Sequence, residues 1–370
     1  MNIVAGGYRH TLTIDDEGYV WGSGNNSNFE IGRQTKAEQN LLVERIDGLE
    51  RAVSVAAGDS FSLVLIGNGE VWSFGSNEYG QLGHGGIASS LPKQIPSLCS
   101  IVSISCGVTH AMCINEQREV YAMGRNLYGQ LGLGDTKKRD TPVLIPNLSD
   151  ILQVQCGETH SIFLTYSGVV YSTGTSTYGQ LGLTGSSLHK TPEPIPDIPN
   201  TIKIVCGVDH SLLLSSEGDL YTFGRNSLGQ LGTGDTLNQR TPQKIDLSFI
   251  GEEIRELAAG NNHSMLLTTG GTVYASGSND YGIIGDTNVK GYTPKFQLIH
   301  NLDNVILMEN GVNHAIFKIE DEVWGLGRNY NGQLGSGDSN QKNEPIQIKS
   351  SHNYIAHPNR NFAKVKSARK

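Results

Sequence analysis

The sequence predicts an all-β protein, a seven-bladed β-propeller of four-stranded antiparallel blades, and three observations support this. A glycine-histidine motif recurs about every 50 residues, apolar runs with the two-residue period of strands follow it, and each unit carries an aromatic residue three positions before a glycine. A constant period of this length is typical of repeat folds. Seven units of four short strands favour a closed, radial arrangement of sheets.

The motif G-x-x-H marks the same position in every unit. It ends at His10, His110, His160, His210, His263 and His314, and the second unit has Phe61 in place of the histidine. Successive copies are 49 to 53 residues apart, so no unit contains a large insertion.

Each unit is interpreted as four strands. A short strand such as 52–58 precedes the motif, and an apolar run such as 210–214 follows it. A strand that is apolar on both faces is covered on both faces. The third strand carries the aromatic residue, which is Trp21, Trp72, Tyr121, Tyr171, Tyr221, Tyr274 or Trp324. The fourth strand, such as 141–145, begins next to a proline, which is tolerated at the first residue of a strand. This strand order places the G-x-x-H turns and the loops after the third strands on one face of the ring.

The chain begins inside a unit, and the fourth strand of the last unit (345–348) has no following partner. We therefore expect the N-terminal strand to complete the last sheet, which would hide two strand edges and close the ring. The propeller is assigned to residues 1–349. Residues 350–370 form a basic C-terminal tail, interpreted as solvated and flexible or, alternatively, as a sorting or translocation signal.

Composition narrows the functional classes. A net charge of -8 argues against a surface that binds nucleic acid directly, because such surfaces cluster Lys and Arg. The five cysteines include no C-x-x-C spacing, so neither a zinc site nor a disulfide framework is indicated and a reducing compartment is expected. No apolar run reaches the ~20 residues of a membrane span, and neither end carries a secretory or lipidation signal. We expect no cofactor and no metal.

The stretch YGQLGLGDT (128–136) has the glycine content of a phosphate-binding loop. Such loops lie between a strand and a helix start, whereas this stretch leads through KKRDTP to another strand. Near-copies of it recur in the other units, so we interpret it as a corner of the blade with Leu131 directed inward.

These motifs resemble the regulator of chromosome condensation repeat family, whose seven-bladed propellers carry G-x-x-H, an aromatic-x-x-Gly strand end and GQLG in each repeat. GQLG begins at Gly80, Gly129, Gly179, Gly229 and Gly332, and the first and sixth units depart from it as FEIG (29–32) and GIIG (282–285). The resemblance covers residues 1–349. The founding member is a nuclear guanine-nucleotide exchange factor for the small GTPase Ran, and relatives include effectors that intracellular bacteria inject to act on host GTPases.

The resemblance implies partner-binding residues at and just before the motif histidine. By position these are Asp59, Glu158, Asp209, His210 and His314. The family exchange factor also has a β-hairpin wedge inserted in one blade, whereas the even spacing here shows no such insertion, which argues against the same exchange mechanism. For the repeat histidines, the alternative to ligand, base or partner contact is that each imidazole ties its turn to nearby backbone.

Arg125, Arg225 and Arg328 share one position directly after the glycine that ends the third strand. They are interpreted as pairing with acids of the same loops, Asp135, Asp235 and Asp338. The alternative is a set of interface anchors, since arginine is enriched at interface hot spots.

Two functions remain open. The first is binding of a Ran-like or related small GTPase with guanine-nucleotide exchange, in a protein of the cell or in a bacterial effector delivered into a host. The second is a non-catalytic scaffold or inhibitor. No hydrolytic or transfer chemistry is expected, because no nucleophile lies in a recognisable catalytic context. We expect a monomer in the cytoplasm or nucleus, or one translocated without a classical signal peptide.

Overall fold

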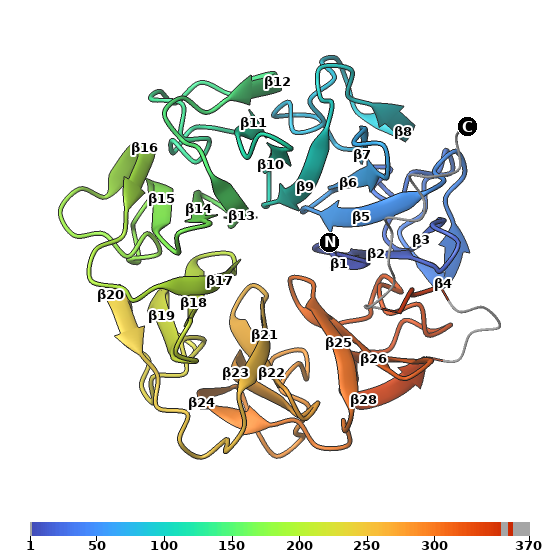
Figure 1. Cartoon of the computed structure of the whole chain (residues 1–370). Helices are drawn as coiled ribbons and strands as arrows, with labels where there is room; N and C mark the ends of the chain where they lie inside the picture. The colour runs from blue at the N-terminus through green and yellow to red at the C-terminus, as the bar shows by residue number, and fades with distance from the viewer. Residues whose placement is uncertain (1, 349–353, 358–370) are drawn as a thin grey trace.

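The computed structural model describes residues 2–348 and 354–357. Strands are the only regular elements in this part of the chain, and they form seven four-stranded antiparallel sheets around a central axis (Figure 1). The predicted seven-bladed β-propeller is confirmed. No helix long and apolar enough to cross a membrane occurs among these residues.

Each blade contributes one strand to each of four concentric positions. The innermost strands are β1 (Val4–Gly6), β5 (Ala52–Ala57), β9 (Ile101–Cys106), β13 (Ile151–Cys156), β17 (Thr201–Cys206), β21 (Ile254–Ala259) and β25 (Val305–Asn310). The second strands are β2 (His10–Ile14), β6 (Phe61–Ile66), β10 (His110–Asn115), β14 (His160–Thr165), β18 (His210–Ser215), β22 (His263–Thr268) and β26 (His314–Ile319). The third strands are β3 (Val20–Gly24), β7 (Val71–Gly75), β11 (Val120–Gly124), β15 (Val170–Thr175), β19 (Leu220–Gly224), β23 (Val273–Ser278) and β27 (Glu322–Gly327). The outermost strands are β4 (Asn40–Arg45), β8 (Ser89–Gln94), β12 (Arg139–Leu144), β16 (Leu188–Pro194), β20 (Gln239–Lys244), β24 (Tyr292–Leu298) and β28 (Lys342–Ile348).

Strand register places two sets of loops at one end of the ring. The first residue of each second strand lies opposite the glycine near the end of the third strand, as in His110 with Gly124 and His210 with Gly224. The G-x-x-H turns and the loops after the third strands therefore share one face, as the sequence predicts. We call this the top face, and we call the hairpins between second and third strands, at the opposite end, the lower hairpins.

The ring closes in a different way from the one that the sequence predicts. The N-terminal strand β1 pairs with β2 in the first sheet, and the last sheet is completed by its own fourth strand, β28. The expectation of strand exchange is wrong, because the seventh repeat supplies all four strands of its blade. Blades 7 and 1 instead meet through side-by-side contacts, including an isolated antiparallel bridge between Leu42 and Ser336.

Neighbouring blades are joined at the top face by a recurring chain of hydrogen bonds, which we call the latch. In blade 4, His160 Nε2 lies 3.2 Å from the hydroxyl of Ser211 in blade 5, and that hydroxyl donates to the Gln180 carbonyl of blade 4 at 2.9 Å. The same latch joins His10 to Ser62, His110 to Ser161, His210 to Ser264 and His314 to Thr11. The imidazoles therefore tie one blade to the next, rather than each tying its own turn.

A second circle of bonds runs along the G-x-x-H turns. In every junction a backbone N–H of one turn donates to a carbonyl of the next turn, at 2.8 to 3.3 Å. The last bond of the circle, from Val312 to the Gly7 carbonyl, spans the junction between blades 7 and 1. The motif glycines allow this close approach, because a Cβ at Gly157 would collide with both the His160 ring and the Gly207 carbonyl.

Two junctions lack the histidine-hydroxyl latch, and both have Ala where the hydroxyl would be. Opposite Ala111, the second unit has Phe61, which is fully buried and packs against Gly58 as the imidazoles pack against their glycines. In the sixth junction Ala315 removes the hydroxyl, and the Asn310 amide nitrogen lies 3.1 Å from His263 Nε2. Each departure thus fits a junction without a hydroxyl: an apolar ring lies opposite one alanine, and an amide meets the imidazole at the other.

The pairing of Phe61 with Ala111 predicts strong coupling between these positions. Phe61→His alone would bury an imidazole with no hydroxyl to meet it, and should lower the free energy of unfolding by about 1–3 kcal/mol. Adding Ala111→Ser should restore the latch, giving a favourable coupling energy of about 1 kcal/mol or more in a double-mutant cycle. Urea unfolding of the four proteins measures this, and additive effects would contradict the pairing.

Candidate functional site

The three acidic residues implied by the resemblance all lie on the top face. Asp59, Glu158 and Asp209 occupy G-x-x-H turns of blades 2, 4 and 5, and Asp59 also lines the central channel. The circle of turn-to-turn bonds includes the backbone N–H groups of Asp59 and Glu158. These carboxylates are therefore carried by backbone that the ring holds in place.

The carboxyl of Asp209 is confined by its surroundings. Burial, followed by the nearby negative charge of Glu158, raises the pKa of Asp209 to about 6, while the Arg225 guanidinium opposes this shift. The Arg225 Nη1 and Asp209 Oδ2 atoms are 3.7 Å apart, and the Asp209 side chain is 13% exposed. A confined carboxylate whose ion pair with a cation is this long is suited to accept a positively charged group from a partner.

Asp59 lies beside a second acid that sequence reasoning missed. Burial raises the pKa of Asp59, opposed by the Ser60 hydroxyl, which donates to it at 3.1 Å, and by the charge of Arg9. Glu30 stands where most other units have glutamine, in the departing loop FEIG, and it is fully buried. The Asn28 backbone N–H donates to its carboxylate at 2.8 Å, and burial raises the pKa of Glu30, with the charge of Asp59 adding to the shift.

The two histidines that the resemblance implies as partner contacts are buried between blades. His210 and His314 are fully buried and contribute their Nε2 atoms to latches with Ser264 and Thr11. Burial lowers the pKa of His210 to about 4 and that of His314 to about 3, so both rings are neutral at physiological pH. This placement favours the structural interpretation of the repeat histidines.

Each of the three equivalent arginines stacks on at least one tyrosine of a neighbouring blade, and Arg125 and Arg328 also stack on a tyrosine of their own blade. Arg125 lies over the rings of Tyr79 and Tyr128, and Arg225 lies over Tyr178, at 5.1 to 5.6 Å from the ring centroids. Arg328 lies 5.3 to 5.8 Å from the centroids of Tyr8, Tyr281 and Tyr330, and so joins blades 6, 7 and 1. Tyr79, Tyr128 and Tyr178 directly precede GQLG, so a recurring tyrosine is the sequence signal for three of these stacks.

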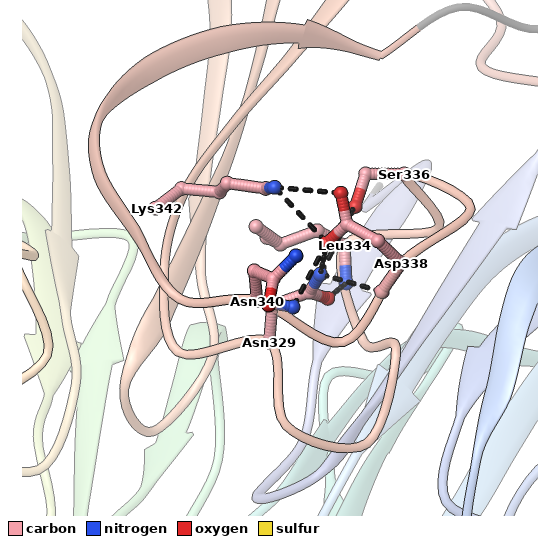
Figure 2. Close-up of polar contacts among 6 residues, drawn as sticks. All are labelled: Asn329, Leu334, Ser336, Asp338, Asn340 and Lys342. Atoms are coloured by element: carbon pink, nitrogen blue, oxygen red, sulfur yellow. Dashed lines mark hydrogen bonds and ion pairs between the residues drawn. The ribbon is translucent and has the colours of Figure 1, made fainter.

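The predicted ion pairs between these arginines and the acids of their own loops are not present. Asp135 pairs with Arg139 at 2.8 Å, and Asp338 pairs with Lys342 at 2.7 Å, because each cation follows its acid by four residues, at the start of the outermost strand. Figure 2 shows Lys342 reaching both oxygens of Asp338. Asp235 instead accepts from its own loop, including the hydroxyl of Thr233.

The GQLG loops are corners of the blades, as predicted. Leu131 is fully buried, and its N–H donates to the side chain of buried Asn126 at 3.0 Å. Figure 2 shows the same arrangement in blade 7, where Asn329 accepts from Leu334 and donates to Ser336 and Asp338. The loops that carry the tyrosines are thus anchored from inside.

The central channel contains thiols but no reactive nucleophile. Cys106, Cys156 and Cys206 line a cavity of about 210 Å³, and burial raises the pKa of each thiol. Thiols in this state are poor nucleophiles at neutral pH. Within residues 2–348 and 354–357, no group of three or more His, Cys, Asp or Glu side chains is placed to hold a metal ion.

The fold and the site together define a closed repeat propeller whose top face presents carboxylates and aromatic-supported arginines, which is the chemistry of a binding surface. The sequence matches the RCC1-like domain over residues 1–251, and the regulator of chromosome condensation (RCC1) repeat over residues 254–283 and 320–367. The chain belongs to the RCC1-like domain family.

Similar proteins agree on the fold. Human E3 ubiquitin-protein ligase HERC2 is 36% identical over 93 residues, which is 25% of this chain and 2% of that protein. The zebrafish RCC2 homologue is 38% identical over 78 residues, 20% of this chain and 16% of that protein. These matches span only a small part of either relative. The solved structures of Saccharomyces cerevisiae Prp20p and human WBSCR16 superpose with a TM-score of 0.81 each at 23% identity, covering 93% and 90% of this chain and 88% and 93% of theirs.

The environment of Asp209 predicts how its titration responds to its neighbours. Glu158→Gln removes a negative charge and should lower the pKa of Asp209 below about 6, whereas Arg225→Gln removes a cation and should raise it. Carbon-13 NMR of the carboxyl group measures both. Glu217→Gln, in the lower hairpin of the same blade as Asp209, is the control and should leave the midpoint in place. Shifts of the opposite sign would show that other charges set this pKa.

Proposed function

We propose that the propeller binds a small GTPase with its top face and accelerates release of the bound guanine nucleotide. The observation that carries the proposal is the confined carboxylate of Asp209, held beside Glu158 on backbone fixed by the ring. The structural neighbour Prp20p has been described with its binding properties to Gsp1p and histones. The family resemblance to a Ran exchange factor supports the same kind of partner.

The top-face carboxylates and the arginine stacks would have different roles in such a complex. Nucleotide-binding loops of GTPases hold phosphates with a lysine and backbone N–H groups. Carboxylates such as Asp209 and Asp59 would attract those groups once the phosphates leave. Arginine and tyrosine are enriched at interface hot spots, so the stacks around Arg125, Arg225 and Arg328 would anchor the partner.

Exchange of this kind needs no catalytic residue. A protein that binds the nucleotide-free GTPase more tightly than the nucleotide-bound form must weaken nucleotide binding by the same factor, because coupling between two ligands is reciprocal. The propeller therefore has to discriminate between two states of its partner.

A non-catalytic scaffold or inhibitor is the second candidate, and one observation favours it. Every strand in residues 2–348 belongs to one of the seven blade sheets, so this part of the chain contains no inserted hairpin like the wedge of the family exchange factor. In either case we propose a monomer acting in cytoplasm or nucleus, or in a host cell after delivery by an intracellular bacterium.

Release of a fluorescent guanine nucleotide from a panel of small GTPases tests the proposal. Micromolar propeller should accelerate release from at least one member, and Asp209→Asn should reduce that acceleration by about tenfold or more, because loss of one buried charge contact costs at least ~1.4 kcal/mol. Asp219→Asn is the matched control, since Asp219 pairs with Lys244 next to the lower hairpin of the same blade.

The two candidate functions give opposite binding preferences in the same experiment. Exchange requires that the propeller recover the nucleotide-free GTPase selectively. Recovery of a GTPase with its nucleotide retained, and no acceleration across the panel, would reject exchange and support the scaffold.

The arginine stacks give a separate prediction. Arg328→Ala should weaken binding of the responding GTPase by about tenfold or more, since it removes an arginine supported by three tyrosines at the junction of blades. Arg45→Ala removes a similar stack, on Tyr19 away from the top face, and should leave affinity unchanged. Titration calorimetry measures both, and equal losses would show that the effect is on stability instead.

A further inference from the structure

Six of the seven junctions between blades are crossed by a covalent linker that follows a common route. In the first junction the Ala52 N–H donates to the Gly18 carbonyl of the lower hairpin of blade 1, and the Arg51 carbonyl accepts from Gly67 of the next lower hairpin. The linkers of the next three junctions make the same two bonds, and each of the remaining two makes one of them. Each linker thus holds together the lower ends of the blades it joins.

The junction between blades 7 and 1 has no such linker, and another segment occupies the equivalent place. The Ala356 N–H donates to the Ile14 carbonyl at 2.7 Å, next to the lower hairpin of blade 1, and the His357 N–H donates to Asp16 at 3.3 Å. On the other side, the Lys318 ammonium of blade 7 donates to the Ile355 carbonyl at 2.6 Å. Tyr354, Ile355 and Ala356 are buried and belong to the core shared by the two blades.

Lys318 stands at a position that is otherwise apolar. Its equivalents in the other six blades are Ile14, Leu65, Ile114, Leu164, Leu214 and Leu267. Lys318 is fully buried, and burial lowers its pKa, opposed by the charges of Asp321 and Asp16. A buried ammonium requires hydrogen-bond acceptors. In blade 7 the Ile355 carbonyl supplies such an acceptor, which gives a reason for the lysine in this repeat.

We propose that Tyr354–His357 is a closure strap that replaces the missing linker, so that blades 7 and 1 form the junction that loosens when the strap is released. The expectation of a solvated tail does not hold for these four residues. The basic residues Arg360, Lys364, Lys366, Arg369 and Lys370 lie outside the described residues.

Hydrogen exchange measured by mass spectrometry tests the strap in three forms of the protein. These are the full chain, a truncation that removes 351–370, and a control truncation that removes only 359–370 and keeps the strap. Loss of the strap should speed exchange in β2 and β26 by about tenfold or more, because opening of one junction exposes the strands beside it. Exchange in β14 and β18 should change by less than about twofold in the same sample.

Two point variants keep the test decisive if the protein that lacks 351–370 does not fold. Ala356→Pro in the full chain removes the N–H that bonds to Ile14, and should reproduce the local effect on β2 and β26. In a Lys318→Met background, Ala356→Pro should speed exchange less than it does with Lys318, because no buried ammonium loses the Ile355 carbonyl as an acceptor. Equal changes in all blades, no change in β2 and β26, or the same strap effect in both backgrounds would overturn the proposal.

Discussion

The rest of the structure depends on the latch, in which an imidazole of one blade meets a hydroxyl of the next and that hydroxyl donates back to the first blade. In blade 4 this chain runs from His160 through Ser211 to the carbonyl of Gln180. It is buried, and burial lowers the pKa of His160 to about 3, which keeps the ring neutral. Because the carbonyl belongs to the GQLG loop and the imidazole to the G-x-x-H turn, one set of bonds fixes both groups of loops that make up the top face.

Much of this fold could be predicted from the sequence, because each repeat carries its strand pattern and glycines locally. The latch could not be predicted by comparing repeats at one position, since its imidazole and hydroxyl lie in different repeats and at different positions within them. Phe61 takes the place of a histidine because Ala111 of the next blade offers no hydroxyl, and Asn310 meets His263 of the preceding blade because Ala315 of its own blade offers none. The mode of ring closure was predicted wrongly for a related reason. The segment proposed to close the ring, Tyr354–His357, has no counterpart in the repeat pattern.

The sequence predicted where the candidate site lies better than it predicted which residues contact one another there. Topology alone places Asp59, Glu158 and Asp209 on one face, and the structure confirms that placement. The predicted partners of the arginines were wrong. Proximity in sequence favoured acids of the same loop, such as Asp338, but a lysine four residues further on pairs with that acid. Curvature of the ring brings the arginines to tyrosines of adjacent blades, a relation that only the closed propeller creates.

A ring fixed at every junction limits how the proposed exchange reaction can work. A ligand shifts a conformational equilibrium only by its difference in affinity for the two states. The top-face turns are joined in an unbroken circle of backbone bonds, and the side chains that support them are buried. Large rearrangement of this face would break several of those bonds together, so the partner has to supply the conformational change. The propeller then acts as a rigid template for the nucleotide-free state, and its selectivity comes from carboxylates and arginines held in place before the GTPase arrives.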